Sequence, residues 1–505
     1  MKNLSGRQRI ISATLILAMT GSILLNSCAG NSIDADSSSP TDNQNAQNNT
    51  ASSTEATTER IKHDVPDIDF EGYDFKSVVR SGDIYWSTVD VYAEIENADP
   101  INDAVYRRNK ILEDKFNITI SEIRQQDNIM PYVQKLILSG SDDFDVFYPT
   151  MNDAGTLVQQ GLLNNLYDIQ YLSFDKPWWN KTTNDSLSIG NKLYAAAGDI
   201  TTMANDATWT VLFNKALLRD YGLTNPYDLV KAGKWTLDVL HENSKIATKD
   251  LNSDGVLEPE DQWGTIGQHE TAYSLFAGTG QKIAEKNEED LPVLSFNSER
   301  TIAALTKVID FLSDDFAQIK ADDAKNSKYT NVWVDISNKG FSESRALYMV
   351  TNFEMAKTLR NMDADFGMLP LPKFDENQEM YYSTMQYNNA TALCVPVTAA
   401  NPNRTGAILE AWAAESVTTL TVAYYEKTLK GKVSRDDESA EMLDLIFSSR
   451  VIDSGMFFNW AGLMNVFYDF SKAKKLDFAS KYEKLEPQLI KAIERTIKAI
   501  EDNNE

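Results

Sequence analysis

The stretch Asp145-Val146-Phe147-Tyr148-Pro149-Thr150-Met151-Asn152 decides the fold. Its apolar part, with Phe144 before it, has the length and composition of a short buried strand, and it runs into small and polar residues ahead of a helical pattern around Leu157. In open α/β sheets, ligands bind beyond the carboxyl ends of the strands. Tyr148 and Asn152 are therefore candidate ligand contacts.

Strand and helix patterns alternate on the amino-terminal side of this stretch. Three short apolar runs are expected to be strands, and two segments with apolar residues at helical spacing are expected to be helices. Short strands interleaved with helices predict a mostly parallel, doubly wound α/β sheet. The expected strands cover 75–80, 118–123 and 144–148, and the expected helices cover 102–116 and 130–139.

Further motifs follow in a fixed order along the chain. An apolar strand ends in Asn214-Lys215, a Gly-Leu turn and a Trp-Thr helix start come next, and two later strands precede a Val-Pro and an Asn-Pro-Asn segment. With 145–166, this order resembles the bacterial extracellular solute-binding proteins of the maltose-binding type, the family 1 substrate-binding lipoproteins of ABC importers. The motifs are 208–215, 221–226, 233–236, 340–349, 366–372, 395–396 and 401–416.

The resemblance implies a two-lobed α/β fold of the periplasmic-binding-protein type, in which each lobe is a mostly parallel sheet flanked by helices. A body of this length also exceeds one ordinary domain. Three segments would form the hinge between the lobes, near 199–206, 345–349 and 386–393. We expect lobe 1 to comprise 65–200 and 348–390, and lobe 2 to comprise 201–347 and 391–505.

The resemblance also implies a ligand-binding cleft between the lobes and no enzymatic activity. A sugar site combines aromatic rings, which stack on C–H faces, with polar side chains that partner hydroxyls. Such combinations recur along the chain, Trp86 and Asn352-Phe353 match cleft positions of the family, and an oligosaccharide is the expected ligand. The candidate ligand contacts are Trp86, Tyr148, Asn152, Asp206, Trp209, Asn352, Phe353, Gln386, Tyr387 and Trp460.

The alternative for each ring is the hydrophobic core, because most of the nine Trp and 21 Tyr must be buried somewhere. Mutation separates the two interpretations. If Trp86 or Trp209 contacts the ligand, replacement by Ala weakens binding and spares stability. If either ring belongs to the core, the same replacement lowers stability.

A calcium-loop pattern lies at 250–261. Asp250, Asn252 and Asp254 occupy the first, third and fifth positions of the loop, glycine occupies the sixth, Val256 offers a backbone carbonyl at the seventh and Asp261 stands at the twelfth. Hard oxygen ligands at this spacing can surround one Ca²⁺. The twelfth residue is usually Glu, and the alternative is a polar surface turn. We predict a structural Ca²⁺ site.

The amino terminus reads as an export signal. Lys2, Arg7 and Arg9 precede an apolar run that ends in Leu25-Asn26-Ser27-Cys28. That ending resembles the lipobox of bacterial lipoproteins, so 1–27 is predicted to be a signal peptide and Cys28 the lipidated first residue. The alternatives are an ordinary secreted protein and an uncleaved anchor.

A polar tether and an acidic charge follow from composition. Residues 28–64 hold almost no large apolar side chain and are predicted to be a flexible tether that keeps the body near the extracellular face of the cell membrane. Loss of the leader, with its three basic and no acidic residues, changes the formal charge from −26 to −29. That charge argues against nucleic acid and anionic lipid surfaces as ligands. The expected protein is a monomer whose partners are a ligand and the permease subunits.

Two other functions stay open. A surface-anchored carbohydrate-active enzyme would need a carboxylate pair, but the abundant acidic residues stand in no recognisable frame, and the three His show no metal spacing. A binding module that serves a sensor cannot be separated from a transport receptor by sequence. Cys394, the other cysteine, lies in an apolar strand-like run and is expected to be a buried thiol.

Overall fold

The computed structural model describes residues 62–80, 90–126, 128–324, 328–359, 362–425 and 436–502. The chain from Ile61 to Glu505 forms one compact unit. The predicted leader, Cys28, the predicted tether up to residue 61, and Trp86 lie outside the described residues. Among the described helices, none has the length and apolar character needed to cross a membrane.

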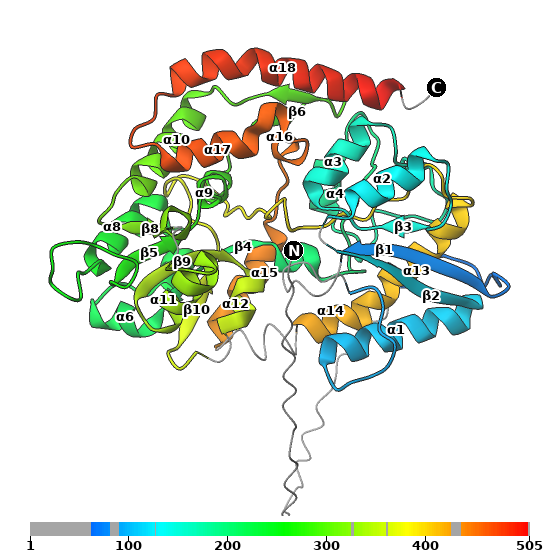
Figure 1. Cartoon of the computed structure of the whole chain (residues 1–505), viewed down its shortest axis with the longest axis horizontal. Helices are drawn as coiled ribbons and strands as arrows, with labels where there is room; N and C mark the ends of the chain where they lie inside the picture. Colours follow the sequence, from blue (N-terminus) through cyan, green and yellow to red (C-terminus); the bar gives the residue numbers. More distant parts are fainter. Residues whose placement is uncertain are drawn as a thin grey trace, which may run out of the picture. The chain divides into compact units, whose positions relative to one another are not determined.

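The first sheet is parallel, with β1 between β2 and β3 (Figure 1). β1 and β2 pair in register from Tyr73 with Ile118 to Arg80 with Gln125. The helix between them starts at an Asp99 side chain that accepts two backbone amides, and it ends at Asn117 in the left-handed conformation. These elements confirm the predicted alternation. The first lobe contains β1 (Tyr73–Arg80), α1 (Pro100–Phe116), β2 (Ile118–Gln125), α2 (Met130–Leu138), β3 (Val146–Phe147), α3 (Met151–Gln159), η2 (Leu166–Asp168), α4 (Lys181–Leu187), α13 (Pro402–Thr418) and α14 (Leu420–Val422).

The second sheet has five strands in the order β10-β4-β9-β5-β8 (Figure 1). It is mixed, because β4 runs antiparallel to both of its neighbours while β5 runs parallel to β9 and β8. The second lobe contains β4 (Trp209–Asn214), α6 (Lys215–Asp220), α7 (Pro226–Lys231), α8 (Leu237–Ala247), β5 (Trp263–Gly267), α9 (Thr271–Gly278), β6 (Ala284–Lys286), β7 (Pro292–Leu294), α10 (Glu299–Leu312), β8 (Gln318–Lys320), η3 (Ala321–Ala324), η4 (Trp333–Asn338), α11 (Lys339–Ser342), β9 (Ala346–Asn352), α12 (Phe353–Thr358), β10 (Phe366–Leu369) and α15 (Asp437–Ser448).

The strand pairings correct the expected lobe boundaries at two segments. β9 and β10, which we expected in the first lobe, both pair with β4 of the second sheet. Cys394, expected in the second lobe, forms a bridge with Phe147 of the first sheet, and α13 packs on α1. The two segments are exchanged because the antiparallel strands β9 and β10 complete the second sheet before the chain returns.

The chain passes between the two sheets at two of the three predicted places. Ala196 pairs with Leu393 in the first lobe, whereas Thr208 pairs with Met385 at the edge of the second. The first and second crossings therefore lie at 197–207 and 386–392, close to the expected 199–206 and 386–393. The predicted crossing at 345–349 is wrong, because these residues start β9 beside β5. A later passage leads from α14, which packs on α1 and α13, to α15, which packs on β10.

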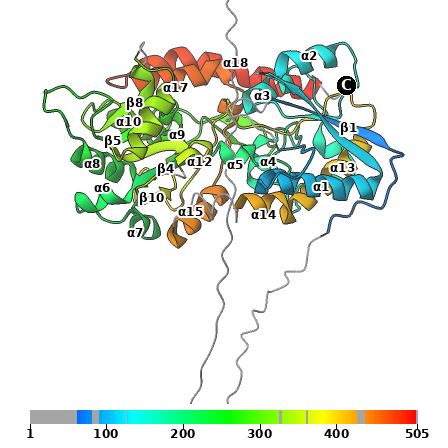
Figure 2. The ribbon, with the colours of Figure 1, turned by 60° about the horizontal axis from the view of Figure 1, so that its bottom comes forward.

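The carboxyl-terminal segment contacts both lobes. α16 (Ser454–Phe457) and α18 (Phe478–Asp502) pack on α3, whereas α17 (Leu463–Lys472), preceded by η7 (Trp460–Gly462), packs on α9 and α10. Asn152 donates a hydrogen bond to the backbone oxygen of Met456 at 2.7 Å, and Gln159 donates one to Thr496 Oγ1 at 2.8 Å. Figures 1 and 2 both show α18 beside α3 and α17. This segment corrects the expectation that 391–505 belongs to the second lobe alone.

Candidate functional site

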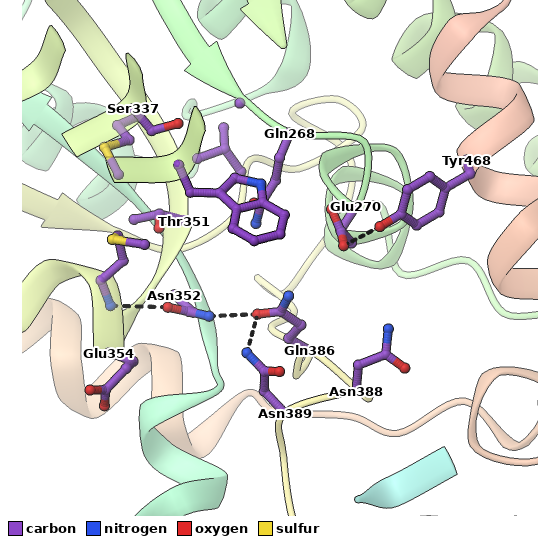
Figure 3. Close-up of a pocket in the computed structure, with 15 residues that line it drawn as sticks. Gln268, Glu270, Ser337, Thr351, Asn352, Glu354, Gln386, Asn388, Asn389 and Tyr468 are labelled. Carbon is purple, nitrogen blue, oxygen red and sulfur yellow. Dashed lines mark hydrogen bonds between the residues drawn. The ribbon is translucent and has the colours of Figure 1, made fainter. Parts of the chain in front are cut away.

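A cleft of about 380 Å³ lies at the carboxyl ends of β5 and β9 (Figure 3). Gln268 follows β5 directly, Asn352 is the last residue of β9, and Asn388 belongs to the second crossing. These are the positions at which open α/β sheets bind ligands. The cleft is lined by Gly267, Gln268, Glu270, Trp333, Ser337, Met349, Val350, Thr351, Asn352, Glu354, Met355, Gln386, Asn388, Asn389 and Tyr468.

Side-chain amides dominate the polar lining of the cleft. Asn352 Nδ2 and Asn389 Nδ2 both donate to Gln386 Oε1, at 2.6 and 3.2 Å. Asn352 Oδ1 in turn accepts the backbone amide of Met355, so this side chain also caps α12. The row of bonds, drawn in Figure 3, fixes the orientation of each amide. Each amide group offers both donors and an acceptor, which matches the hydroxyls of a neutral polar ligand.

On the opposite part of the lining, a carboxylate accepts a hydrogen bond from a phenol. The Tyr468 hydroxyl of α17 donates to Glu270, which precedes α9 (Figure 3). Burial and the Glu270 charge raise the pKa of Tyr468 far above its usual range, so the phenol keeps its proton. Trp333 of η4 adds an aromatic ring to the lining. The cleft therefore combines amides, a carboxylate and a ring, which is the composition expected for sugar binding.

Glu354 connects the cleft with a largely buried group of charged and hydroxyl-bearing side chains that we call the junction: Asp90, Thr202, Asp206, Lys357 and Tyr424. Lys357 Nζ lies 2.8 Å from both Glu354 and Asp206. Asp206 also accepts the Tyr424 hydroxyl at 2.7 Å, and Thr202 donates to Asp90 at 2.6 Å. Burial, with the Asp206 charge adding to it, raises the pKa of Glu354 to about 7 against the opposing effect of Lys357. The junction ties the first crossing to α12 and to Tyr424, which follows α14.

The structure places only some of the predicted contacts at the cleft. Asn352 and Gln386 line it, and Trp209 and Tyr387 line a smaller cavity next to it. Asp206 lies in the junction. The remaining predicted residues with described positions are placed elsewhere: Tyr148 is buried beside another small cavity, Asn152 holds Met456, and Phe353 and Trp460 are buried in the core.

Several lining residues were not predicted from the sequence. Gln268 and Glu270 follow a strand that the strand-end rule could have identified from 263–267. Asn388 and Asn389 come directly after the predicted pair Gln386-Tyr387 and carry the same amide chemistry. Tyr468 lies on α17, which reaches the cleft only through tertiary packing on α9, and no local pattern signals that contact.

The predicted calcium loop has a well-defined hydrogen-bond pattern. Asp250 accepts the backbone amides of Ser253 and Gly255, and Asp254 accepts that of Val256. Asp261 is buried and accepts the amides of Leu251 and Glu258, which closes the loop. Across the part of the chain that the structure describes, no three His, Cys, Asp or Glu side chains gather closely enough to hold a metal ion. Calcium binding by Asp250, Asn252, Asp254, Val256 and Asp261 stays a prediction.

Comparison with solved structures identifies the fold. An ABC substrate-binding protein of Listeria monocytogenes in complex with cycloalternan is similar over 85% of this chain and 99% of its own, at 13% identity and a TM-score of 0.52. A cyclo/maltodextrin-binding protein with maltotetraose matches over 86% and 98% (14% identity, TM-score 0.52). The maltose-binding periplasmic protein of Listeria monocytogenes with maltose matches over 85% and 97% (16%, 0.51).

These similarities show that the chain has the two-lobed fold of the maltose-binding type. No model of a known protein family matches the chain, and no curated protein matches it either.

Proposed function

We propose that the protein is an extracellular solute-binding lipoprotein that captures an oligosaccharide in the cleft at the ends of β5 and β9 and delivers it to an ABC importer. The observation that carries the proposal is the cleft itself, which lies at the ligand-binding end of the second sheet and presents amides, a carboxylate and an indole ring. The solved proteins that share its fold hold cycloalternan, maltotetraose and maltose. All three ligands are carbohydrates.

The chemistry of the lining favours a neutral polyhydroxyl ligand over a charged one. Each of the five amides, Gln268, Asn352, Gln386, Asn388 and Asn389, can both donate to and accept from a hydroxyl. Neither lysine nor arginine is among the described residues that line the cleft, and Lys357, which lies beside the lining residue Glu354, is held by Glu354 and Asp206. A ligand carboxylate would therefore meet Glu270 and Glu354 without an exposed cation to offset them.

A binding screen tests the proposal. The chain without its leader, carrying Cys28→Ser so that no lipid is attached, is screened by thermal shift against mono- and oligosaccharides, amino acids and peptides, because a ligand raises the melting temperature by mass action. Hits are titrated by calorimetry and recovered for product analysis. We expect sugar-specific shifts and unchanged sugar. Shifts with peptides alone would overturn the ligand class, and turnover of a bound sugar would replace the receptor with an enzyme.

The anchor has its own test. Cells that express the full chain are fed a labelled fatty acid, and the labelled protein is followed through membrane fractions. We expect label and membrane association for the natural chain, and loss of both for Cys28→Ala. Label that persists in Cys28→Ala contradicts the lipidation site.

A further inference from the structure

A second, smaller cavity adjoins the cleft, and we call it the annex. Its volume is about 30 Å³, and it shares Glu270, Gln386, Asn388 and Tyr468 with the cleft. The two spaces therefore meet at these four side chains. Beyond them the wall consists of two tyrosines, Tyr273 and Tyr387, and of five apolar residues: Trp209, Met385, Met456, Met464 and Phe467.

Hydrogen bonds within the protein engage several of the polar atoms that border the annex. The hydroxyls of Tyr273 and Tyr387 lie 3.2 Å apart, and the Tyr387 hydroxyl also accepts the backbone amide of Asp453 at 2.9 Å. The Tyr468 hydroxyl donates to Glu270, and Gln386 Oε1 accepts two amides. A buried water needs two to four polar partners, and the three Met and Phe467 in the wall of the annex offer none, so this part of the annex suits an apolar group better than a water.

The size and surface of the annex suit one small apolar group. A volume of about 30 Å³ is roughly twice the minimum that admits a single water-sized probe. Thioether side chains fill irregular gaps and adapt their conformation, and three of the five apolar wall residues are Met. A methyl group at the end of a polar ligand would replace no hydrogen bond there and would bury its apolar surface against these walls.

We infer that the annex selects sugars that carry a methyl group, while the cleft binds the hydroxyl-bearing rings. This inference rests on the proposed function and deepens it, because it names a substituent of the ligand. A sugar can present a methyl group in two chemical forms, the 6-deoxy carbon and the end of an acetamido group. Burial of one such group is expected to tighten binding at least about fourfold.

Matched sugar pairs provide the test. N,N′-Diacetylchitobiose is compared with cellobiose for the acetamido methyl, and 6-deoxyglucose and D-fucose are compared with glucose and galactose for the 6-deoxy methyl. We expect at least one methyl-bearing member to bind about fourfold more tightly, or better, than its partner by calorimetry, and the pair that responds identifies the form. If the parent sugars bind but no methyl-bearing sugar binds more tightly, the inference is overturned and the proposed function stands. If none of these sugars binds although another sugar of the screen does, the inference is overturned, and if no sugar of the screen binds at all, the proposed function fails.

Met464→Phe locates the effect, because Met464 borders the annex but does not line the cleft. The larger ring is expected to fill the annex and to remove the preference for the methyl-bearing sugar, with the parent sugar unaffected. Met380→Phe, at an exposed position, is the matched control and keeps the preference. Should Met464→Phe fail to fold, Met464→Ala enlarges the annex and is expected to admit N-propionylglucosamine more tightly than the natural chain does. If the Met464 variant that folds has the same sugar preference as the natural chain, the inference is overturned.

Discussion

The cleft and the junction lie next to each other and share Glu354, yet they use polar side chains in opposite ways. In the cleft, side-chain amides such as those of Asn352 and Gln386 hydrogen-bond to each other and still face an open space. In the junction, Lys357 and Tyr424 converge on Asp206, which is buried. The comparison teaches that residue type alone does not mark a binding site. What matters is whether the side chain faces a space that a ligand can enter.

The largest effect is expected when a side chain of the packed interior is truncated. Trp209 leads from the first crossing into β4, and only 1% of its surface is exposed. Trp209→Ala is therefore expected to lower the free energy of unfolding by about 3 to 5 kcal/mol, the range for truncation of a large buried ring. Urea denaturation measures it. A loss below about 1 kcal/mol with strongly weakened sugar binding would restore Trp209 as a ligand contact.

The second largest effect is expected when the lysine of the junction is replaced. Lys357→Met leaves Asp206 and Glu354 without their shared cation, and removal of one partner from a buried pair is expected to destabilise the fold by about 3 kcal/mol. Lys339→Met is the control, because that lysine is exposed on α11. Equal unfolding midpoints for the two variants in urea would show that the junction does not stabilise the crossings.

The same comparison explains what the sequence could predict. Apolar periodicity set the strands and helices of the first lobe, because local spacing determines which face is buried. The wrong lobe assignment of β9 and β10 came from strand order, which depends on pairings between residues distant in the sequence. The aromatic contacts Phe353 and Trp460 failed to reach the cleft, since an exposed ring and a buried ring look alike in a sequence. Gln386, predicted as a ligand contact, does line the cleft, because a crossing segment must pass it.

A pH series sharpens the comparison at Glu354, the residue common to both regions. Its pKa in the folded state is about 7, against an ordinary value of 4.5, so the folded protein holds a proton that the unfolded chain has released. Stability is therefore expected to fall as pH rises between these values, by at most about 1.4 kcal/mol per pH unit. Glu354→Gln removes this contribution, and urea midpoints across the range measure the difference. Exposed Glu379→Gln is the control, and identical slopes for both variants contradict the assignment.

A smaller effect is expected for a side chain that faces the open cleft. Gln268 lines the cleft after β5 (Figure 3), and its backbone amide, which bonds to Thr271, is untouched by a side-chain change. Gln268→Ala is expected to weaken binding of the sugar found in the screen about tenfold, through the loss of one or two hydrogen bonds, and to leave the unfolding midpoint unchanged. Calorimetry measures the change in affinity. Gln488→Ala is the control, because Gln488 is exposed on α18. Unchanged affinity would place the ligand away from β5.

The smallest expected effect concerns the loop at 250–261, where the half-buried Asp250 and the exposed Asp254 accept backbone amides. If Asp250, Asn252 and Asp254 bind Ca²⁺ with the weak affinity of extracellular sites, calcium at about 1 mM stabilises the fold by about 1 kcal/mol or less. Asp254→Ala should abolish that thermal shift, because Asp254 is exposed and its loss spares the Asp261 bonds that close the loop. Magnesium, which prefers smaller octahedral sites, should not replace calcium. If calcium still raises the melting temperature of Asp254→Ala, these carboxylate oxygens only stabilise the turn. They would then resemble the carboxylates of the junction, which only stabilise the crossings.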